Sequence, residues 1–515
     1  MARHVMAVDL GSTGIKVAVV DETGRVRSSA GEVIPLVFTA DGGVEQDPHL
    51  WWSALGRCAR HATADAGCTA GDITLVAVTS QYTSTVPVAA DGTPVGNTIM
   101  WMDGRGSRHN TASRQPEQRA RWLDLHGMAP SGNDDIGHIA FIRNELPDVY
   151  AAAAAFVEPM DALAARLTGR VTATQNTMFP MLSVDNRTWG VTEYSDELLA
   201  MSGLDPHKLP PLVPMGAPRG DITADAAAHL GVSPRAVVTG ATIDSVTSAV
   251  GTGAIEPSTC GLIIGTTSVM GTHLGSKRHD IEHGLTTAPS PLPGTWFLVA
   301  ENGIGGKALD VFVNNMVYAD DGLGREVAPD SFDAVLAAAA AVPTGSNGVL
   351  FQPWLVGSMA PGLQRRMRGG FANIGLATTR SDMARSVLEG VAMNAAWLLP
   401  YFSALAGQSY AEVTLGGGGA GSALWGQIVA DCMGIPVRRL ANPRTTNAHG
   451  AALLALSETG SFALAELPAL LAVQQVHHPD PAAHRTMARL TEALVDLHQR
   501  TAPFYEALHT KDLHQ

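Results

Sequence analysis

The sequence predicts an α/β protein of two similar domains that face each other. At 515 residues the chain exceeds what one hydrophobic core usually supports, so two domains of roughly 200 to 260 residues are expected. Residues 5–21 and residues 261–272 share the order strand, glycine-hydroxyl turn, strand. Residues 413–433 have the pattern of a strand, a glycine run and a helix. The chain therefore places a glycine-rich turn at strand ends in both predicted domains.

The first of these stretches predicts a β-hairpin. Residues 5–8 and 15–20 are apolar and rich in β-branched side chains, and they flank the turn at residues 11–14. Such a turn can direct several N–H groups into one concavity that suits phosphate oxygens. Asp9, expected at the last position of the first strand, fits this setting if Mg²⁺ lies between it and the phosphate. An ordinary hairpin in which Asp9 starts the turn explains the same pattern.

Composition argues against several partners. The formal net charge of −14 repels nucleic acid and anionic membranes. Asp9 interrupts the first apolar run too early for a signal peptide, so secretion is not expected. The cysteines are sparse and form no CxxC pair, which favours reduced thiols in the cytoplasm. They are Cys58, Cys68, Cys260 and Cys432.

Residues 390–411 have the length of a membrane span but contain several polar side chains and a proline. Asn394, Pro400 and Gln408 all fall within this stretch. We expect a buried helix that breaks at Pro400, with a membrane span as the alternative.

Polar residues follow the predicted strand at residues 73–78. Gln81, Tyr82 and Thr83 stand where open α/β sheets bind ligands, beyond the carboxyl end of a buried strand. Asp103 and Arg105 follow a later apolar edge, where a ligand contact and a structural salt bridge both fit. Residues 105–218 are helix-like and irregular, which suggests an insertion that caps the substrate.

Asp244 is the strongest candidate for a second functional acid. It follows a predicted strand at residues 236–239 and begins a helix of small residues. The helix dipole would stabilise its ionised form, and helix capping alone could explain it. Residues 240–253 have almost no bulky side chains, which indicates that a ligand approaches closely.

The second glycine-hydroxyl turn repeats the first without its acid. Residues 263–269 align with residues 9–15, and Ile263 takes the place of Asp9. The metal should therefore sit on the N-terminal side. The glycine run at residues 416–421 lies between a strand and a helix, an arrangement that accommodates nucleotides.

Taken in order, these motifs resemble the FGGY carbohydrate kinases of the actin-like ATPase superfamily, most closely the xylulokinase-like branch. The resemblance runs from about residue 5 to residue 456, through segments such as AVDLGSTGIKVAVVD, EQDPHLWW, MWMDGR, ATIDSVTSAVGTG, IGTTS, GGGAGSALWGQIVADCMGIPV and HGAALLA. It implies two actin-like (ribonuclease H-like) domains with mixed sheets flanked by helices and a cleft between them. The expected domains are 1–250, with the sugar side and the capping insertion, and 251–515, with the nucleotide side.

The resemblance also implies roles for individual residues. Asp244 would be the base that deprotonates the sugar hydroxyl, and Asp9 would be the acid nearest to Mg²⁺. The residues implied to bind ATP are Gly11, Ser12, Thr13, Lys16, Gly265, Thr266, Thr267, Gly306, Gly417, Gly418, Gly419 and Ser422. The residues implied to bind the acceptor are Gln81, Tyr82, Thr83, Asp103, Asp244 and Ser245.

The acceptor side departs from the xylulokinase pattern. Tyr82-Thr83 replaces the usual Met-His after the glutamine, and Gly357 to Pro361 lacks a charged pair that many relatives carry. The expected activity is therefore ATP-dependent phosphorylation of a small sugar or polyol other than xylulose. The alternatives are a kinase of a different ketose or polyol, and an inactive ATP-binding module. The oligomeric state is left open, with a homodimer as one option.

Overall fold

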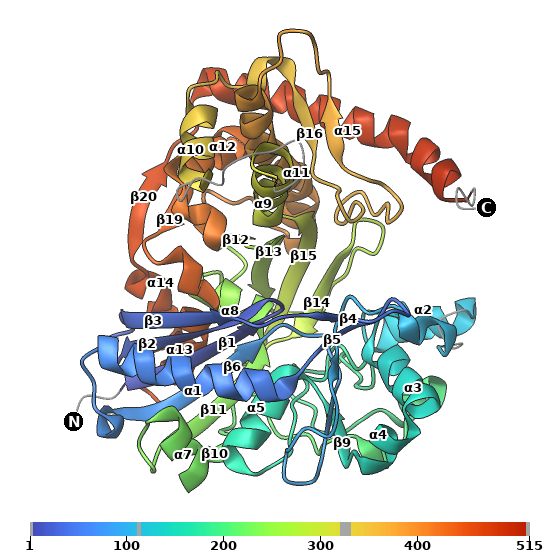
Figure 1. Cartoon of the computed structure of the whole chain (residues 1–515), viewed down its shortest axis with the longest axis vertical. Coiled ribbons are helices and arrows are strands. Elements are labelled where there is room, and N and C mark those ends of the chain that lie inside the picture. Colours follow the sequence, from blue (N-terminus) through green and yellow to red (C-terminus); the bar gives the residue numbers. More distant parts are fainter. Residues whose placement is uncertain (1–3, 111–114, 320–330, 511–515) are drawn as a thin grey trace.

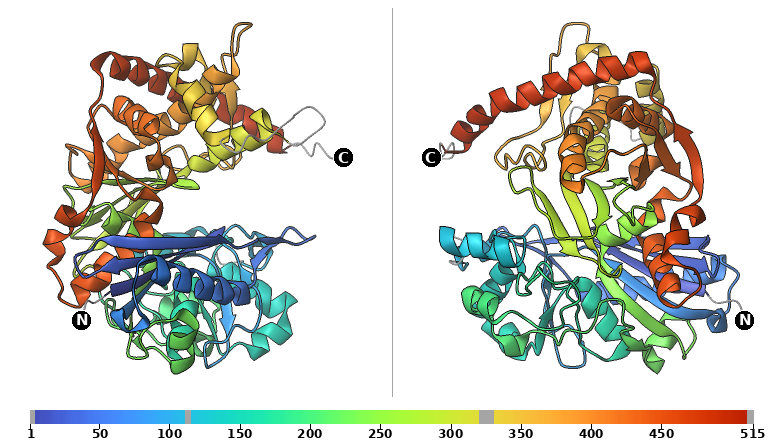
Figure 2. Two further views of the ribbon diagram at one scale, coloured as in Figure 1. Left: turned by 60° about the vertical axis from the view of Figure 1, so that its left-hand side comes forward. Right: turned by 180° about the vertical axis from the view of Figure 1, so that it is seen from behind.

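The computed structural model of the chain describes residues 4–110, 115–319 and 331–510. Two mixed β-sheets, each flanked by helices, form the centres of an N-terminal and a C-terminal half (Figure 1; Figure 2). The predicted α/β class with two sheet-containing domains is confirmed.

The N-terminal sheet has six strands in the order β10-β11-β6-β1-β2-β3. Its strands are β1 (His4–Gly11), β2 (Gly14–Asp21), β3 (Val26–Val33), β6 (Ile73–Ser80), β10 (Gly220–Asp221) and β11 (Val237–Ile243). The predicted hairpin is confirmed, since β1 and β2 pair antiparallel, while β6 runs parallel to both β1 and β11.

Three predicted strand ends were wrong. β6 continues past residue 78 to Ser80, because it pairs with both β1 and β11 up to that residue. β1 continues past Asp9 to Gly11, because its pairing with β2 extends to Gly14. β11 continues to Ile243, because it pairs with β6 as far as Ser80. Asp244 therefore follows its strand immediately.

Both faces of this sheet are buried. Helix α1 (Pro48–Asp65) packs on one face, where Met6 and Val8 of β1 are fully buried. Helix α13 (Thr446–Glu458) packs on the other face. The contact between β1 and α13 joins small side chains: Val5, Ala7, Ala448, Ala451, Ala452 and Ala455. A helix that lies in the predicted domain 251–515 thus completes the core of the N-terminal half.

The C-terminal sheet has seven strands in the order β14-β15-β13-β12-β18-β19-β20. They are β12 (Gly261–Ile264), β13 (Thr267–Leu274), β14 (Leu285–Pro289), β15 (Trp296–Ile304), β18 (Val413–Gly416), β19 (Val437–Leu440) and β20 (Val473–His477). β12 and β13 form an antiparallel hairpin and β18 runs parallel to β12, as β6 does to β1. The predicted repeat is therefore confirmed in its strand pairing.

Helix α11 (Arg380–Ala406) corrects the prediction of a helix that breaks at Pro400. The helix continues through Pro400, since Leu398 and Phe402 on either side are fully buried in the core. Burial of these side chains outweighs the hydrogen bond that proline cannot donate. No helix in the described part of the chain is long and apolar enough to cross a membrane.

Residues that lie in the sequence between β6 and β10 form a helical subdomain (Figure 1) with its own hydrophobic core around Trp122. Its helices are α2 (Pro116–Leu125), α3 (Asp135–Glu145), α4 (Pro147–Ala152) and α6 (Asp196–Ser202). The helical character predicted for residues 105–218 is confirmed, and the capping role stays a prediction. The other elements used below are β5 (Val44–Gln46), β8 (Thr98–Ile99), α5 (Pro159–Thr168), α8 (Asp244–Gly251), α9 (Gly306–Phe312) and α12 (Ala423–Met433).

Candidate active site

Three neighbouring strands end at one edge of the N-terminal sheet and bring the predicted acids together. Leu10 of β1 and Ile243 of β11 both pair with Ser80 of β6. The Gln81 N–H then donates to the Leu10 carbonyl at 2.8 Å. Because Asp244 follows Ile243 directly, Asp9, Gln81 and Asp244 lie at the same edge, where parallel strands of α/β sheets bind ligands.

The Asp9 carboxylate is buried, with 3% of its surface exposed. Its Oδ2 atom lies 3.7 Å from the Lys16 ammonium, across the β1–β2 hairpin. Burial raises the pKa of Asp9, and the Lys16 charge and the Asn447 side chain act against this shift. The Oδ1 atom has no hydrogen-bond partner among the described residues. A buried carboxylate oxygen without a partner is a ligand that suits Mg²⁺.

Asp244 begins α8, as predicted, and its Oδ1 accepts a hydrogen bond from the Ser245 hydroxyl at 3.3 Å. Burial and the negative charges of Asp9 and Glu301 raise the pKa of Asp244 to about 7, against the hydrogen bonds from Ser245, which lower it. A carboxylate with a pKa near neutrality is suited to accept a proton from a hydroxyl group.

Tyr82 lies beside the same carboxylate. Burial raises the pKa of its phenol well above the ordinary value, and the charges of Glu301 and Asp244 add to this shift. A hydrogen bond with the Ser245 side chain acts in the opposite direction. The neutral Tyr82 hydroxyl is thus held near Asp244. Thr83, the next residue, stands where the resemblance implies an imidazole.

The Gln81 side chain is engaged inside the protein. Its Oε1 accepts the Ser84 hydroxyl at 2.8 Å, and its Nε2 lies 4.0 Å from the Met100 sulfur. Thr83 has a positive φ of 59°, which is rare for a residue branched at Cβ. The segment that follows β6 therefore has a specific, strained conformation.

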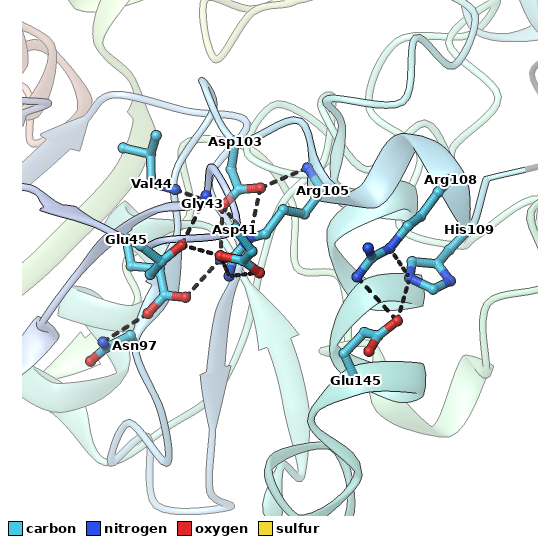
Figure 3. Close-up of polar contacts among 11 residues, drawn as sticks. Asp41, Gly43, Val44, Glu45, Asn97, Asp103, Arg105, Arg108, His109 and Glu145 are labelled. Atoms are coloured by element: carbon cyan, nitrogen blue, oxygen red, sulfur yellow. Dashed lines mark hydrogen bonds and ion pairs between the residues drawn. The ribbon is translucent and has the colours of Figure 1, made fainter. Parts of the chain in front are cut away.

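Asp103 and Arg105 form the centre of an ion-pair cluster, drawn in Figure 3. Arg105 contacts Asp103 at 2.8 Å and Glu45 at 2.6 Å, and it also pairs with Asp41. Asp103 is fully buried, and its Oδ2 also accepts the Val44 N–H at 2.8 Å. These contacts favour the structural salt bridge that the sequence left open, and they join β5 to the segment that follows β8.

The first phosphate-turn candidate, residues 11–14, is linked to the acceptor side. The Ser12 hydroxyl accepts the Trp101 indole N–H at 2.9 Å. Trp101 in turn donates its backbone N–H to the Ser84 hydroxyl at 3.0 Å. The turn between β1 and β2 and the segment after β6 are therefore joined by two hydrogen bonds.

The second turn, at Gly265 and Thr266, is joined to the start of α9. The Gly306 N–H donates to the Gly265 carbonyl at 2.6 Å, and the Gly305 N–H donates to the Thr266 carbonyl at 3.0 Å. A Cβ atom at Gly306 would lie 2.7 Å from the Gly265 carbonyl oxygen. The close approach explains why glycine occupies this position.

The glycine run packs against the end of β12. Gly417 has a φ of +81°, and a Cβ there would lie 2.6 Å from the Ile264 carbonyl oxygen. Gly419 approaches the Ile264 side chain, whereas a Cβ at Gly418 would meet nothing within 4 Å. The Ser422 hydroxyl caps α12 by accepting the Trp425 N–H at 3.2 Å. The structure thus brings Gly265, Gly306 and Gly417 together around the end of β12. The contacts of the predicted residues with the nucleotide, those of Thr13 and Thr267 included, stay a prediction.

Sequence reasoning missed three acids near this site. Glu301, on β15 of the C-terminal half, raises the pKa of both Asp244 and Tyr82. A lone acid in the apolar strand Trp296–Ile304 was a signal that could have identified it. Glu158 and Asp135 lie behind the segment that follows β6, and no sequence motif marks them.

Comparison with known proteins places the chain among carbohydrate kinases. Residues 4–251 match the FGGY family of carbohydrate kinases, N-terminal domain, and residues 260–458 match its C-terminal domain. A xylulose kinase of Staphylococcus epidermidis is 25% identical over 99% of this chain and 97% of that protein. A glycerol kinase of Leptothrix cholodnii is 30% identical over 92% of this chain and 95% of that protein. The crystal structure of a gluconate kinase from Lactobacillus acidophilus has the same fold, with a TM-score of 0.84 and 20% identity, over 99% of this chain and 100% of that chain.

Proposed function

Because the chain belongs to the FGGY family of carbohydrate kinases, we propose that it phosphorylates a neutral ketose or polyol, with Asp244 as the general base. One observation carries the proposal: Asp244 stands at the first position of α8, beside Asp9, with a pKa of about 7. The base is ionised in a large fraction of molecules at neutral pH, yet basic enough to accept the proton of a hydroxyl group.

The reaction transfers the terminal phosphoryl group of ATP to an acceptor hydroxyl. Asp244 orients this hydroxyl and takes its proton as the new P–O bond forms. Ser245 donates a hydrogen bond to Asp244 and holds the carboxylate in place. The N–H groups of the turns at residues 11–14 and 265–267 would bind the phosphate oxygens, with Lys16 adding a positive charge.

Asp9 is the residue that would hold a magnesium ion. In the described residues no cluster of three His, Cys, Asp or Glu side chains could hold a metal. A single carboxylate is sufficient for Mg²⁺ when phosphate oxygens and water supply the other ligands. The unpartnered Asp9 Oδ1 fits this role, and the ion would supply charge neutralisation at the phosphates.

The charges around Asp244 support a neutral acceptor. The ionisable groups that act on Asp244 and Tyr82 are carboxylates: Asp9, Glu301 and Glu158, besides Asp244 itself. A sugar acid would add a further negative charge to this site, which opposes its binding. Neutral hydroxyl groups can instead donate hydrogen bonds to these oxygens. Xylulose and glycerol, the substrates in the names of two relatives, are both neutral.

The test is a coupled ADP-release assay with ketopentoses, ketohexoses, pentitols, glycerol and gluconate as acceptors. We expect at least one neutral acceptor to stimulate ADP release, and we expect the Asp244→Asn variant to bind ATP without turnover. An inactive ATP-binding module replaces the proposal if no acceptor raises ADP release above the level of this variant.

A further inference from the structure

A buried acid supports the strained segment that follows β6. Glu158, the residue before α5, is fully buried. Its Oε1 accepts the Thr83 N–H at 3.1 Å and its Oε2 accepts the Ser84 N–H at 3.2 Å. Both carboxylate oxygens therefore bind the backbone of the segment that carries Gln81 and Tyr82.

A second buried acid faces the first. Asp135, the first residue of α3, is fully buried, and its Oδ1 accepts the Thr85 hydroxyl. The Asp135 and Glu158 side chains lie within hydrogen-bonding reach of each other. The Asp135 Oδ2 atom, however, is buried and has no donor among the described residues. Two ionised carboxylates cannot face each other in a buried site without a large cost, so one proton must lie between them.

The hydrogen bonds indicate which acid carries this proton. Glu158 accepts two N–H groups, which favours its ionised form. Asp135 has one oxygen that lacks a partner, and an O–H at Oδ2 would donate to Glu158 and satisfy that atom. Burial, the charge of Asp135 and the hydrogen bond between the two acids raise the pKa of Glu158. Burial also raises the pKa of Asp135, whereas the same hydrogen bond lowers it. The placement of the proton on Asp135 therefore rests on the two N–H groups that Glu158 accepts and on the unpartnered Oδ2 of Asp135.

We propose that the O–H of neutral Asp135 donates a hydrogen bond to ionised Glu158, and that this pair positions the segment from Gln81 to Thr85 for acceptor binding. The pair offsets the cost of the positive φ of Thr83 by fixing the N–H groups of Thr83 and Ser84. The two acids are positioning residues, since they act on the acceptor through this segment. The inference rests on the proposed function, because that proposal assigns the acceptor to this segment.

Other ionisable groups surround the pair. Asp134 precedes Asp135, and His138 contacts the Thr85 hydroxyl at 3.1 Å. Asp161 of α5 lies near Glu158 but is paired with Arg219 at 2.6 Å. The His138 Nδ1 atom lies 3.9 Å from Asp135 Oδ1, the oxygen that also accepts the Thr85 hydroxyl. No donor to the other oxygen, Oδ2, is found among the described residues, and a proton shared with Glu158 would satisfy that atom.

The kinetic test compares two amide variants that the proposal predicts to differ. Asp135→Asn keeps a donor toward Glu158, so the acceptor KM should stay within about twofold of wild type. Glu158→Gln loses an acceptor for one N–H group, so the acceptor KM should rise roughly tenfold or more with the ATP KM unchanged. Similar acceptor KM values in both variants, or equal effects on acceptor and ATP, would overturn the proposal.

Asp134→Asn is the matched control. Asp134 is also a buried acid, but its oxygens accept the Gly132 and Gly137 N–H groups at 2.9 and 3.0 Å at the start of α3. Its loss should lower the Tm without raising the acceptor KM relative to the ATP KM. A selective rise in acceptor KM in this variant would contradict a specific role for the Asp135–Glu158 pair.

Infrared spectroscopy provides a readout that does not depend on activity. The C=O stretch of a neutral carboxylic acid should be present in wild type at pH 7 and diminished in Asp135→Asn. A band that is unchanged in Asp135→Asn would mean that the proton belongs to another acid and would overturn the inference. Failure of all acceptors in the ADP-release assay would instead remove the proposed function, and the infrared result would still stand.

Discussion

Replacing Asp244 by Asn tests the proposed base directly. The substitution keeps the size and the hydrogen-bonding shape of the side chain but removes its ability to accept a proton. General-base catalysis typically contributes roughly 10²- to 10⁴-fold, so kcat should fall by that factor. ATP binding, measured by calorimetry without an acceptor, should change little. Retention of more than about a tenth of wild-type kcat would refute the role of Asp244.

The pKa of Asp244 also predicts the pH profile. With a pKa of about 7 in the free enzyme, wild type should lose about tenfold in kcat/KM for each pH unit below that value. The residual activity of Asp244→Asn should lack this acidic limb. An acidic limb that persists in Asp244→Asn would assign the titration to a different group.

The same shift predicts an effect on stability with a defined sign. Because the folded pKa is raised from 3.8 to about 7, the folded protein binds this proton more tightly than the unfolded chain does. Wild type therefore loses stability as the pH rises from about 4 to about 7. Asn carries no charge and avoids this loss, so the Tm of Asp244→Asn should exceed that of wild type by more at pH 8 than at pH 5. A lower Tm for the variant at pH 8 would indicate a structural role instead.

Further predictions concern the charges near Asp244, the glycine run and the magnesium ion. Glu301→Gln removes a negative charge that raises the pKa of Asp244, so the acidic limb of kcat/KM should move to lower pH. Because the site is surrounded by carboxylates, wild type should phosphorylate gluconate poorly. Gly417→Ala places a Cβ 2.6 Å from the Ile264 carbonyl oxygen at a φ of +81°, so the ATP KM should rise several-fold. Gly418→Ala is the control, because its Cβ would meet no atom within 4 Å, and this variant should behave as wild type. Removal of divalent cations should abolish ADP release. Asp9→Asn should raise the Mg²⁺ concentration needed for the half-maximal rate. An unchanged Mg²⁺ dependence in this variant would contradict the role of Asp9.

Local patterns predicted the repeated elements well. Both hairpins, the strand before the glycine run and the start of α8 were correct because glycine turns and β-branched runs determine structure over a few residues. The strand ends at Asp9 and Thr239 were wrong because pairing with neighbouring strands extended them. The predicted break at Pro400 was wrong because burial on both sides of the proline stabilises the helix.

The site was predictable only where a motif marks it. Asp9 lies near the end of a strand that the sequence reveals, and Asp244 directly follows another. The sheet order then brings both acids to one edge. Glu301, Glu158 and Asp135 come from three elements that are distant in the sequence, and only packing brings them near the segment after β6. The role of Asp103 was ambiguous because an acid two residues before an arginine can bind a ligand or form a structural ion pair. Only the contacts of Arg105 in the structure distinguish these roles.

The helix that carries Asp244 contacts both halves of the molecule. α8 continues directly from β11 of the N-terminal sheet, and its Ala249 faces Gly271 of β13 in the C-terminal sheet. Its other side lies so close to α13 that a Cβ at Gly450 would be 1.8 Å from the Thr247 carbonyl oxygen. Since packed helices at this distance cannot deform independently, a change in the angle between the two sheets must move α8 and α13 together. Asp244 is therefore the first residue of a helix, α8, whose position depends on both domains. A base should lie at such a place if the acceptor and the nucleotide bind to opposite halves.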